Sequence, residues 1–224
     1  MRASGYMNII ILGPQGSGKG TQAKMLAEKF GLEYFEMGKI LRDVAKENTH
    51  LGKLIHETIN IKGLLVDNDT FREVFFKKLS ETPEEKGILF EGVPRNEYQL
   101  EFFKEDSTEM NRKIDATIVI NLPEKESIER LSKRRVCKEN EHVLIIGKDI
   151  KGENEKCPKC GSEIHQRIDD TPARIKTRLG IYEKNTKPVI DYFRQKGILV
   201  EIDGRPSIEE VHQSILNKLK KLNE

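Results

Sequence analysis

The glycine-rich segment at residues 13–21 has the residue types and spacing needed to bind phosphate. It reads GPQGSGKGT and lies between an apolar, strand-like run at 8–12 and a segment with apolar residues at helical spacing. Glycines in that context let backbone N–H groups turn around an anion, the helix N-terminus adds its dipole, and a lysine reaches the outer phosphates. A turn that only closes a strand–helix corner is the alternative. We predict a phosphate-binding loop with the candidate ligands Gly16, Ser17, Gly18, Lys19, Gly20 and Thr21.

A basic cluster at residues 130–135 could also contact phosphate. Arg130 and Arg134 are four residues apart, so a helix would place both on one face. A planar guanidinium group can hold two phosphate oxygens at once, whereas a lysine offers only a point charge. A solvated or nucleic-acid-binding surface is the alternative interpretation. The phosphate loop in the same chain favours the first.

The three cysteines suggest a metal site. Cys157 and Cys160 have the C-x-x-C spacing of a zinc knuckle, followed by Gly161. His142 could complete a Cys-Cys-Cys-His site, which suits tetrahedral structural zinc. A thioredoxin-like redox pair, a metal-free hairpin and a surface role for His142 remain alternatives. An odd number of cysteines in a chain of 224 residues argues against a disulfide framework.

Short apolar runs alternate with longer segments of helical period along the chain. The runs at 8–12, 33–36, 88–91, 117–122 and 199–203 are typical of strands. Such alternation predicts an α/β fold, a parallel sheet with helices on both faces. Two stretches interrupt it: 37–61 is rich in helix signals, and 136–166 is polar and contains all the cysteines. We expect one compact domain with two insertions, closed by a helix from about Pro206 to about Leu222.

Composition excludes several classes of protein. Lys and Arg number 39 against 37 Asp and Glu, so a net charge of +2 gives little support to binding nucleic acid or a membrane surface. No apolar run approaches the about 20 residues of a membrane helix. Residues 1–7 are too short and polar for a secretory signal, so we expect a cytoplasmic protein.

The sequence Gly18-Lys19-Gly20-Thr21 resembles the phosphate loop of nucleoside monophosphate kinases, and of adenylate kinases in particular. Gly20 departs from the general motif, which has serine or threonine after the lysine. Further matches extend over nearly the whole chain: Gly38, Ile40, Leu41 and Arg42; Gly63 to Val66; Glu91 to Arg95 with Gln99; Arg130, Arg134 and Arg135; Arg167 to Asp170; and Arg178. The resemblance implies a P-loop NTPase-type core (1–36, 67–135 and 167–224), a monophosphate-binding first insertion (37–66) and a lid segment (136–166).

The resemblance also implies an activity, the reversible transfer of the terminal phosphoryl group of ATP to AMP, giving two ADP. Residues implied at the transferred group are Lys19, Arg95, Arg130, Arg134, Arg167 and Arg178. The loop, Arg130 and Arg134 would bind ATP. AMP would be bound by Met37, Arg42, Leu64, Leu65, Val66, Gly92, Arg95, Gln99, Arg167 and Arg178. Magnesium would accompany ATP, held through water by Glu91 at the family's aspartate position, although Glu91 could merely cap a turn.

The acceptor pocket is where the chain departs most from adenylate kinases. Met37 stands where the family has a threonine that helps recognise adenine, Lys39 replaces an aspartate and Val93 a phenylalanine. A thioether offers no useful hydrogen bond to a base, so Met37 could equally pack in the core. Gln99 remains to read adenine. The alternatives are another acceptor, such as CMP or UMP, and a nucleotide-dependent switch.

The lid segment is similar to the zinc-bearing lids of some bacterial adenylate kinases. That likeness adds Cys137 to His142, Cys157 and Cys160 as implied ligands, although a second cysteine after Cys137 is lacking. The zinc would be structural. Asp169 and Asp170 follow Arg167 at the lid hinge, so we expect them to pair with arginines. The partners implied are ATP and a nucleoside monophosphate, with no nucleic acid or membrane, and we expect a monomer.

Overall fold

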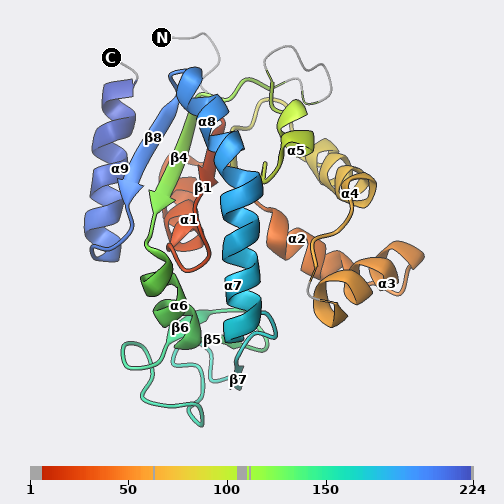
Figure 1. The fold of residues 1–224 in the computed structure, drawn as a ribbon, viewed down its shortest axis with the longest axis vertical. Helices are drawn as coiled ribbons and strands as arrows, with labels where there is room; N and C mark the ends of the chain where they lie inside the picture. The colour runs from red at the N-terminus through yellow and green to blue at the C-terminus, as the bar shows by residue number, and fades with distance from the viewer. Residues whose placement is uncertain (1–6, 63, 105–109, 111, 223–224) are drawn as a thin grey trace.

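The computed structural model describes residues 7–62, 64–104, 110 and 112–222. Its centre is a five-stranded sheet in the order β2-β3-β1-β4-β8, and every pair in it is parallel (Figure 1). The strands are β1 (Ile9–Leu12), β2 (Glu33–Glu36), β3 (Ile88–Glu91), β4 (Ala116–Asn121) and β8 (Leu199–Asp203). The predicted parallel α/β sheet is confirmed.

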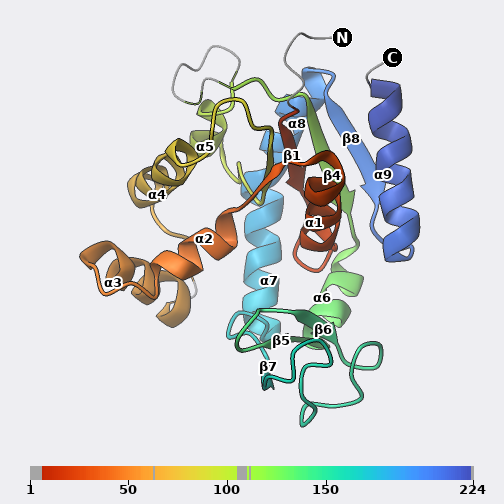
Figure 2. The same ribbon diagram turned by 180° about the vertical axis from the view of Figure 1, so that it is seen from behind.

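Alternation along β1 explains why both faces of the sheet are covered. Ile9 and Ile11 belong to a buried cluster with α1 (Lys19–Phe30) and α9 (Ile208–Leu222). Ile10 and Leu12 belong to a second cluster with α4 (Asn68–Ser80) and α8 (Lys187–Gln195). Successive side chains of a strand point to opposite faces, so an all-apolar strand needs helices on both sides. Figures 1 and 2 show α9 and α8 on opposite sides of the sheet.

The first insertion begins directly after β2, and the other connecting elements are helices on the core. The first insertion contains α2 (Met37–Val44), α3 (His50–His56) and a π-helical turn, η1 (Glu57–Ile61). The connections to the core add α5 (Glu97–Glu101), α6 (Glu124–Ser132) and a nearly continuous helix formed by α7 (Pro172–Ile181), η2 (Tyr182–Thr186) and α8. The arrowheads of β4 and β8 point toward the lid segment in Figure 1.

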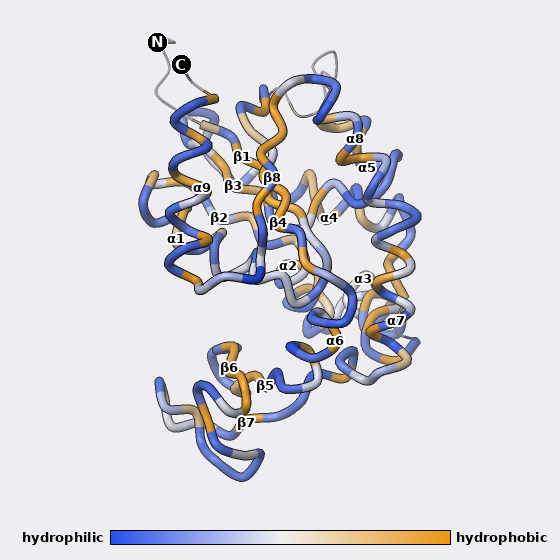
Figure 3. Tube along the Cα trace, turned by 60° about the vertical axis from the view of Figure 1, so that its left-hand side comes forward, coloured by the Kyte–Doolittle hydropathy of each residue, from blue (hydrophilic) through white to orange (hydrophobic). Residues whose placement is uncertain are grey.

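The lid segment is built on a small antiparallel sheet. Its strands are β5 (Arg134–Cys137), β6 (Val143–Ile145) and β7 (Ile164–His165), in the order β6-β5-β7. The segment is largely hydrophilic, in contrast to the strands of the main sheet (Figure 3). Its buried cluster consists of Cys137, Leu144, Ile150 and Cys157.

Three predicted elements have displaced boundaries, the first of them β1, which begins at Ile9 and not at residue 8. The fourth main strand is shifted toward the N-terminus, at Ala116–Asn121 instead of 117–122. The last helix begins at Ile208 and not at Pro206, because Ser207 and Glu210 form a capping box: each side chain accepts a hydrogen bond from the other residue's backbone N–H. Among the described residues, no helix combines the length and apolar character that a membrane crossing needs.

Candidate active site

The phosphate loop connects β1 to α1 in a conformation that depends on glycine. Gly16 and Gly18 both have φ 85°. Gly13 is crowded, since a Cβ there would meet the carbonyl oxygen of Ile120 at 2.6 Å. Lys19 opens α1, and its Nζ donates to the carbonyl oxygen of Pro14 at 3.2 Å, folding back over the loop. Of the other predicted ligands, Ser17 is buried, Gly16 and Gly20 are half-buried, and Gly18 and Thr21 are exposed.

Lys19 lies in a positive electrostatic environment. The pKa of Lys19 is lowered to about 8, chiefly by burial and in part by the charges of Arg95, Arg178 and Arg134, while the charge of Glu91 acts in the opposite direction. The arginines come from the loop after β3, the helix α7 and the strand β5. The fold therefore brings three separate elements of the chain to the lysine of the loop.

Glu91 ends β3 beside the loop. Its Oε2 accepts a hydrogen bond from the Tyr34 hydroxyl at 3.1 Å, and a Cβ placed on Gly20 would lie 3.8 Å from that same oxygen. Glu36 is the last residue of β2 and pairs with Glu91 across the sheet, and burial and the charge of Glu91 raise its pKa. Sequence reasoning missed Tyr34, because its link to Glu91 depends on the pairing of β2 with β3.

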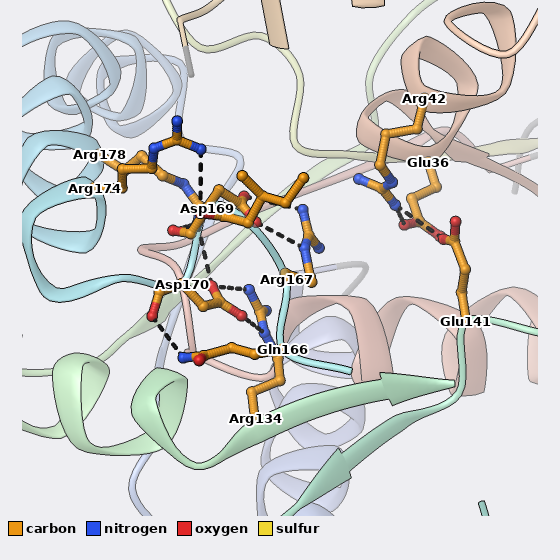
Figure 4. A network of polar contacts seen from close by, with 11 residues as sticks. Glu36, Arg42, Arg134, Glu141, Gln166, Arg167, Asp169, Asp170, Arg174 and Arg178 are labelled. Carbon is orange, nitrogen blue, oxygen red and sulfur yellow. Dashed lines mark hydrogen bonds and ion pairs between the residues drawn. The ribbon is translucent and has the colours of Figure 1, made fainter. Parts of the chain in front are cut away.

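Three arginines at the hinge of the lid segment, Arg134 of β5, Arg167 and Arg178 of α7, meet two aspartates (Figure 4). Arg134 makes a bidentate contact with Asp170, with Nε–Oδ2 2.7 Å and Nη2–Oδ1 2.6 Å. Arg167 makes two 3.0 Å contacts with the carboxylate of Asp169. Arg178 reaches both aspartates, Asp169 at 2.9 Å and Asp170 at 3.5 Å. The expected pairing of the hinge aspartates with arginines is confirmed.

Burial and charge act against each other in this network. Burial raises the pKa of Asp169, but Arg167, Arg178 and Arg134 outweigh it and hold that pKa below its ordinary value. Burial lowers the pKa of Arg178 to about 10, with Arg167 and Arg134 adding to the effect. Arginines crowded in this way gain from a further negative ligand.

Arg95 and Gln99 form one unit at the end of β3. The Nε of Arg95 donates to the carbonyl oxygen of Gly92 at 2.6 Å, and its backbone N–H donates to Oε1 of Gln99 at 2.7 Å. Gly92 has φ 73°, and a Cβ there would meet Arg95 Nη2 at 2.6 Å. With its oxygen engaged, the amide NH2 of Gln99 is the part that can turn toward a base.

Arg42 and Arg130 lie on opposite sides of this centre. Arg42, on α2, contacts Glu36 at 3.4 Å and Glu141 of the lid segment at 3.3 Å. Arg130, on α6, donates to the carbonyl oxygens of Gly16 at 3.5 Å and Arg205 at 3.2 Å. A cavity of about 310 Å³ between α6 and β6 is lined by Arg130 together with Ile145 and Ile146.

The four predicted metal ligands come together in the lid segment. The ligand atoms of Cys137, His142, Cys157 and Cys160 all lie within 4.8 Å of one another. Sγ of Cys160 lies 3.7 Å from Sγ of Cys137, and Sγ of Cys157 lies 3.5 Å from Nδ1 of His142. Tetrahedral zinc with bonds of about 2.3 Å to sulfur places its sulfur ligands about 3.8 Å apart. The donor set and its spacing fit that ion.

Comparisons with known proteins agree with this geometry. A family model described as adenylate kinase matches residues 11–198. Over 217 residues, 96% of this chain and the whole of the relative, the sequence is 40% identical to an adenylate kinase of Archaeoglobus fulgidus. It is 39% identical to one of Caldanaerobacter subterraneus over 95% of this chain and 96% of the relative.

The chain belongs to the adenylate kinase family. An adenylate kinase of Kosmotoga olearia is also similar, 38% identical over 96% of this chain and the whole of the relative. The matches span nearly the full length, so both the first insertion and the lid segment have counterparts in adenylate kinases.

The acceptor side departs from the adenylate kinase pattern at three residues, Met37, Lys39 and Val93, of which Val93 is fully buried. Met37 is 2% exposed and packs in the cluster that includes Phe35 and Leu41, which supports the core-packing interpretation of this residue. Lys39 pairs with Asp43 on the surface of α2. Leu64 and Leu65 are exposed and Val66 is half-buried, whereas Gly63 lies outside the described residues.

Besides Tyr34, three further features of this chain escaped sequence reasoning. Glu141 belongs to no sequence motif, and it reaches Arg42 only because the lid segment folds. Ile145 at the end of β6 and Ile146 directly after it line the cavity at Arg130 because β6 pairs with β5. The contact of Arg130 with the carbonyl of Arg205 joins residues 75 positions apart. Only the apolar run that precedes Gly147 was available as a signal for β6.

Proposed function

We propose that this chain catalyses the reversible transfer of the terminal phosphoryl group of ATP to AMP, giving two ADP. The observation that carries the proposal is the convergence of Arg95, Arg134 and Arg178 on Lys19. Two nucleotides bring several negative charges together, and fixed cationic groups stabilise the charge on the phosphoryl group during its transfer. The family membership of the chain supports the same reaction.

Each side of the centre has its own proposed substrate. The loop residues Gly16 to Thr21 and Arg134 would hold the phosphates of ATP, with Lys19 at the outer phosphates. The cavity beside Arg130 suits the adenine of ATP, since a guanidinium plane and two isoleucines give a flat base cationic and apolar contacts. Arg42, Arg95, Arg167 and Arg178 would hold the phosphate of AMP, with its base near Gln99, Leu64, Leu65, Val66 and Gly92. Met37 would support that pocket from the core.

Magnesium fits the acidic end of β3. It would bridge phosphate oxygens and neutralise their charge, and Glu91 would hold it through water. The hydroxyl of Tyr34 fixes one oxygen of Glu91, which leaves the other oxygen to accept from a metal-bound water. The longer side chain of glutamate replaces the family's aspartate at this position.

Zinc is the proposed ion of the lid segment, with Cys137, His142, Cys157 and Cys160 as ligands. Hydrogen bonds from Ser162, and then from Asn140, lower the pKa of Cys160, which favours the thiolate that a metal binds. The ion would be structural, because a closed four-ligand site leaves no position for substrate. We further propose the division into a core, a first insertion and a lid segment, and a monomer acting in the cytoplasm without nucleic acid or membrane.

The test is phosphoryl transfer from magnesium ATP to a panel of AMP, CMP, UMP, GMP and TMP, measured as nucleoside diphosphate formed. We expect AMP to be preferred, and Lys19→Ala to lower transfer by about 100-fold or more. Lys29→Ala, on the exposed end of the same helix, is the matched control and should retain activity. Preference for a pyrimidine would overturn AMP as the acceptor. No transfer to any member would overturn the kinase.

A further inference from the structure

A threonine on the long helix formed by α7, η2 and α8 contacts the backbone of Arg95. Thr186 ends η2, is 4% exposed, and donates from its Oγ1 to the carbonyl oxygen of Arg95 at 3.0 Å. The two residues are 91 positions apart, so only the fold brings them together. On the other side, the backbone N–H of Arg95 donates to Oε1 of Gln99, which is 6% exposed. Two buried side chains from separate elements therefore hold the main chain of Arg95.

The hydroxyl of Thr186 has local alternatives that it does not use. Threonine hydroxyls in helices often donate to the carbonyl oxygen four residues back, as Thr177 of α7 does to Ala173. Thr186 also occupies the position before α8, where a threonine side chain can accept from the backbone of the helix N-terminus, but it makes no such bond. The contact with Arg95 takes the place of both local bonds.

The π-helical turn η2 helps to direct Thr186 toward the site. Arg178 lies eight residues earlier, on α7, and is one of the arginines near Lys19. An uninterrupted α-helix of about 3.6 residues per turn would place residues eight apart about 80° from each other around its axis. A π turn holds more residues per turn, so η2 reduces this offset and brings Thr186 more nearly into line with Arg178. Single π turns inside helices are frequent at functional sites.

Arg95 depends on its backbone for its position more than the arginines of the hinge do. Arg134, Arg167 and Arg178 each contact an aspartate carboxylate. In the part of the chain that the structure describes, no carboxylate lies within ion-pair distance of Arg95, whose Nε donates to the carbonyl oxygen of Gly92 in its own loop. The guanidinium group therefore follows the main chain of this loop when the main chain moves.

We propose that Thr186 is a positioning residue for phosphoryl transfer, fixing the backbone of Arg95 and thereby the guanidinium group that contacts the acceptor's phosphate. Its hydroxyl acts through Arg95 and touches no substrate. Loss of the hydroxyl leaves a carbonyl oxygen without its partner, so the loop that carries Arg95 shifts. A small misplacement is costly in a reaction that depends on orientation. The inference rests on the proposed role of Arg95 in acceptor binding.

Thr186→Val tests the inference, because valine keeps the shape of the side chain and lacks the hydroxyl. We expect kcat/KM for AMP, measured at saturating magnesium ATP, to fall about fivefold or more, the range of one lost hydrogen bond, while the KM for ATP stays unchanged. Thr186→Ser keeps the donor and should retain most of the activity. Thr177→Val, at an exposed threonine of α7, is the matched control and should change neither value. A hydrogen bond with only a structural role would lower Tm and leave both kinetic values unchanged.

A double-mutant cycle shows whether Thr186 acts through Arg95. In an Arg95→Ala background, Thr186→Val should have no further effect on kcat/KM for AMP, since the group to be positioned is gone. If Thr186→Val does not fold, Thr186→Ala and Thr186→Ser give the same comparison, because they differ only in the hydroxyl. An unchanged kcat/KM on loss of the hydroxyl, or an equal fall in both backgrounds, overturns the inference. If the unmodified chain transfers nothing to AMP, the proposed function fails first, and the inference fails with it.

Discussion

At the scale of single residues, the site is defined by its charged side chains: several arginines, their aspartate partners and Lys19. The arginines of the hinge have carboxylate partners in the ligand-free protein, and Asp170 is completely buried between Arg134 and Arg178. Lys19 differs from them, because its pKa is lowered to about 8 by burial and by neighbouring arginines. The protonation state of Lys19 is therefore the one that nucleotide binding should change most near neutral pH.

Binding of magnesium ATP should take up protons from solution near pH 8. Phosphate raises the pKa of Lys19 above its ligand-free value of about 8, so about half a proton per site is bound at that pH. Calorimetry in two buffers with different ionisation enthalpies measures the uptake. Near pH 6 Lys19 is already charged in the free protein, so the uptake assigned to it should vanish; equal uptake at both pH values would contradict the assignment.

The lowered pKa of Lys19 also makes the free energy of unfolding depend on pH. The pKa of Lys19 is lower in the folded protein than in the unfolded chain, so the unfolded chain binds more protons between pH 8 and about 10.5. The Lys19 contribution therefore disfavours the folded state below pH 8 and is relieved as the pH rises through that window.

At the scale of elements, the phosphate loop is set by its backbone. Gly13 and Gly18 are required for different reasons, one for space and the other for backbone conformation. A methyl group on Gly13 would meet the Ile120 carbonyl oxygen at 2.6 Å and Ser17 Oγ at 2.7 Å, whereas one on Gly18 would meet nothing within 4 Å. Gly18 thus needs only its φ of 85°, while Gly13 needs the space.

We expect Gly13→Ala to destabilise the protein more than Gly18→Ala. The Gly18 variant incurs only left-handed backbone strain, about 1 kcal/mol, and Gly13→Ala adds about 1–3 kcal/mol of steric overlap. Urea unfolding of both variants measures the difference. Equal losses would mean that the loop relaxes freely around Gly13.

The lid segment is a second element whose stability is local. Two of its four buried cluster residues, Cys137 and Cys157, are also proposed metal ligands. A segment with so small a core depends on the ion for much of its order.

Removing the metal should loosen the lid segment without unfolding the sheet. After chelation, or in Cys160→Ser, hydrogen exchange should accelerate in residues 136–166, while β1 and β4 keep their protection. Elemental analysis should find about one zinc per chain before chelation and none in the variant, as one Cys3His site requires. Unchanged exchange in the lid segment after complete metal loss would contradict a structural ion.

At the scale of the whole molecule, one aromatic cluster joins several elements. Phe75 of α4 is fully buried and contacts rings from β2, from β3 and from the segment after α5: Phe35 at 5.3 Å, Phe90 at 6.2 Å and Phe103 at 5.6 Å between centroids. The side chain therefore connects the sheet to the helices beside the first insertion.

Phe75→Ala should lower the free energy of unfolding by about 3–5 kcal/mol, because a buried cavity remains where the ring was. Phe30→Ala, at a site 38% exposed on α1, should cost about 1 kcal/mol or less. Denaturant titration of both variants gives the values, with an unchanged slope for a purely stability effect. A loss at Phe75 as small as that at Phe30 would exclude a central role for the cluster.

Much of the molecule followed from the sequence by itself. The strand-like runs, the phosphate loop after the first of them and the C-x-x-C pair depend on neighbours within a few residues, where backbone preferences and side-chain type act directly. The fold class and the Cys157 and Cys160 pair were therefore predictable, whereas Cys137 was added by the likeness to zinc-bearing lids. The boundaries of the elements were less predictable. The last helix begins at the capping box of Ser207 and Glu210, two residues after the proline that was expected to open it.

Tertiary structure decided the rest, because the partners are far apart along the chain. Met37 was placed in the core by its packing beside Phe35, which no local pattern could choose over a pocket position. Glu141 meets Arg42 across 99 residues, and Tyr34 meets Glu91 across 57. Such contacts depend on the register of strands and on where a turn directs a side chain. Sequence determined which groups can bind phosphate and metal, and the fold determined which of these charges face one another.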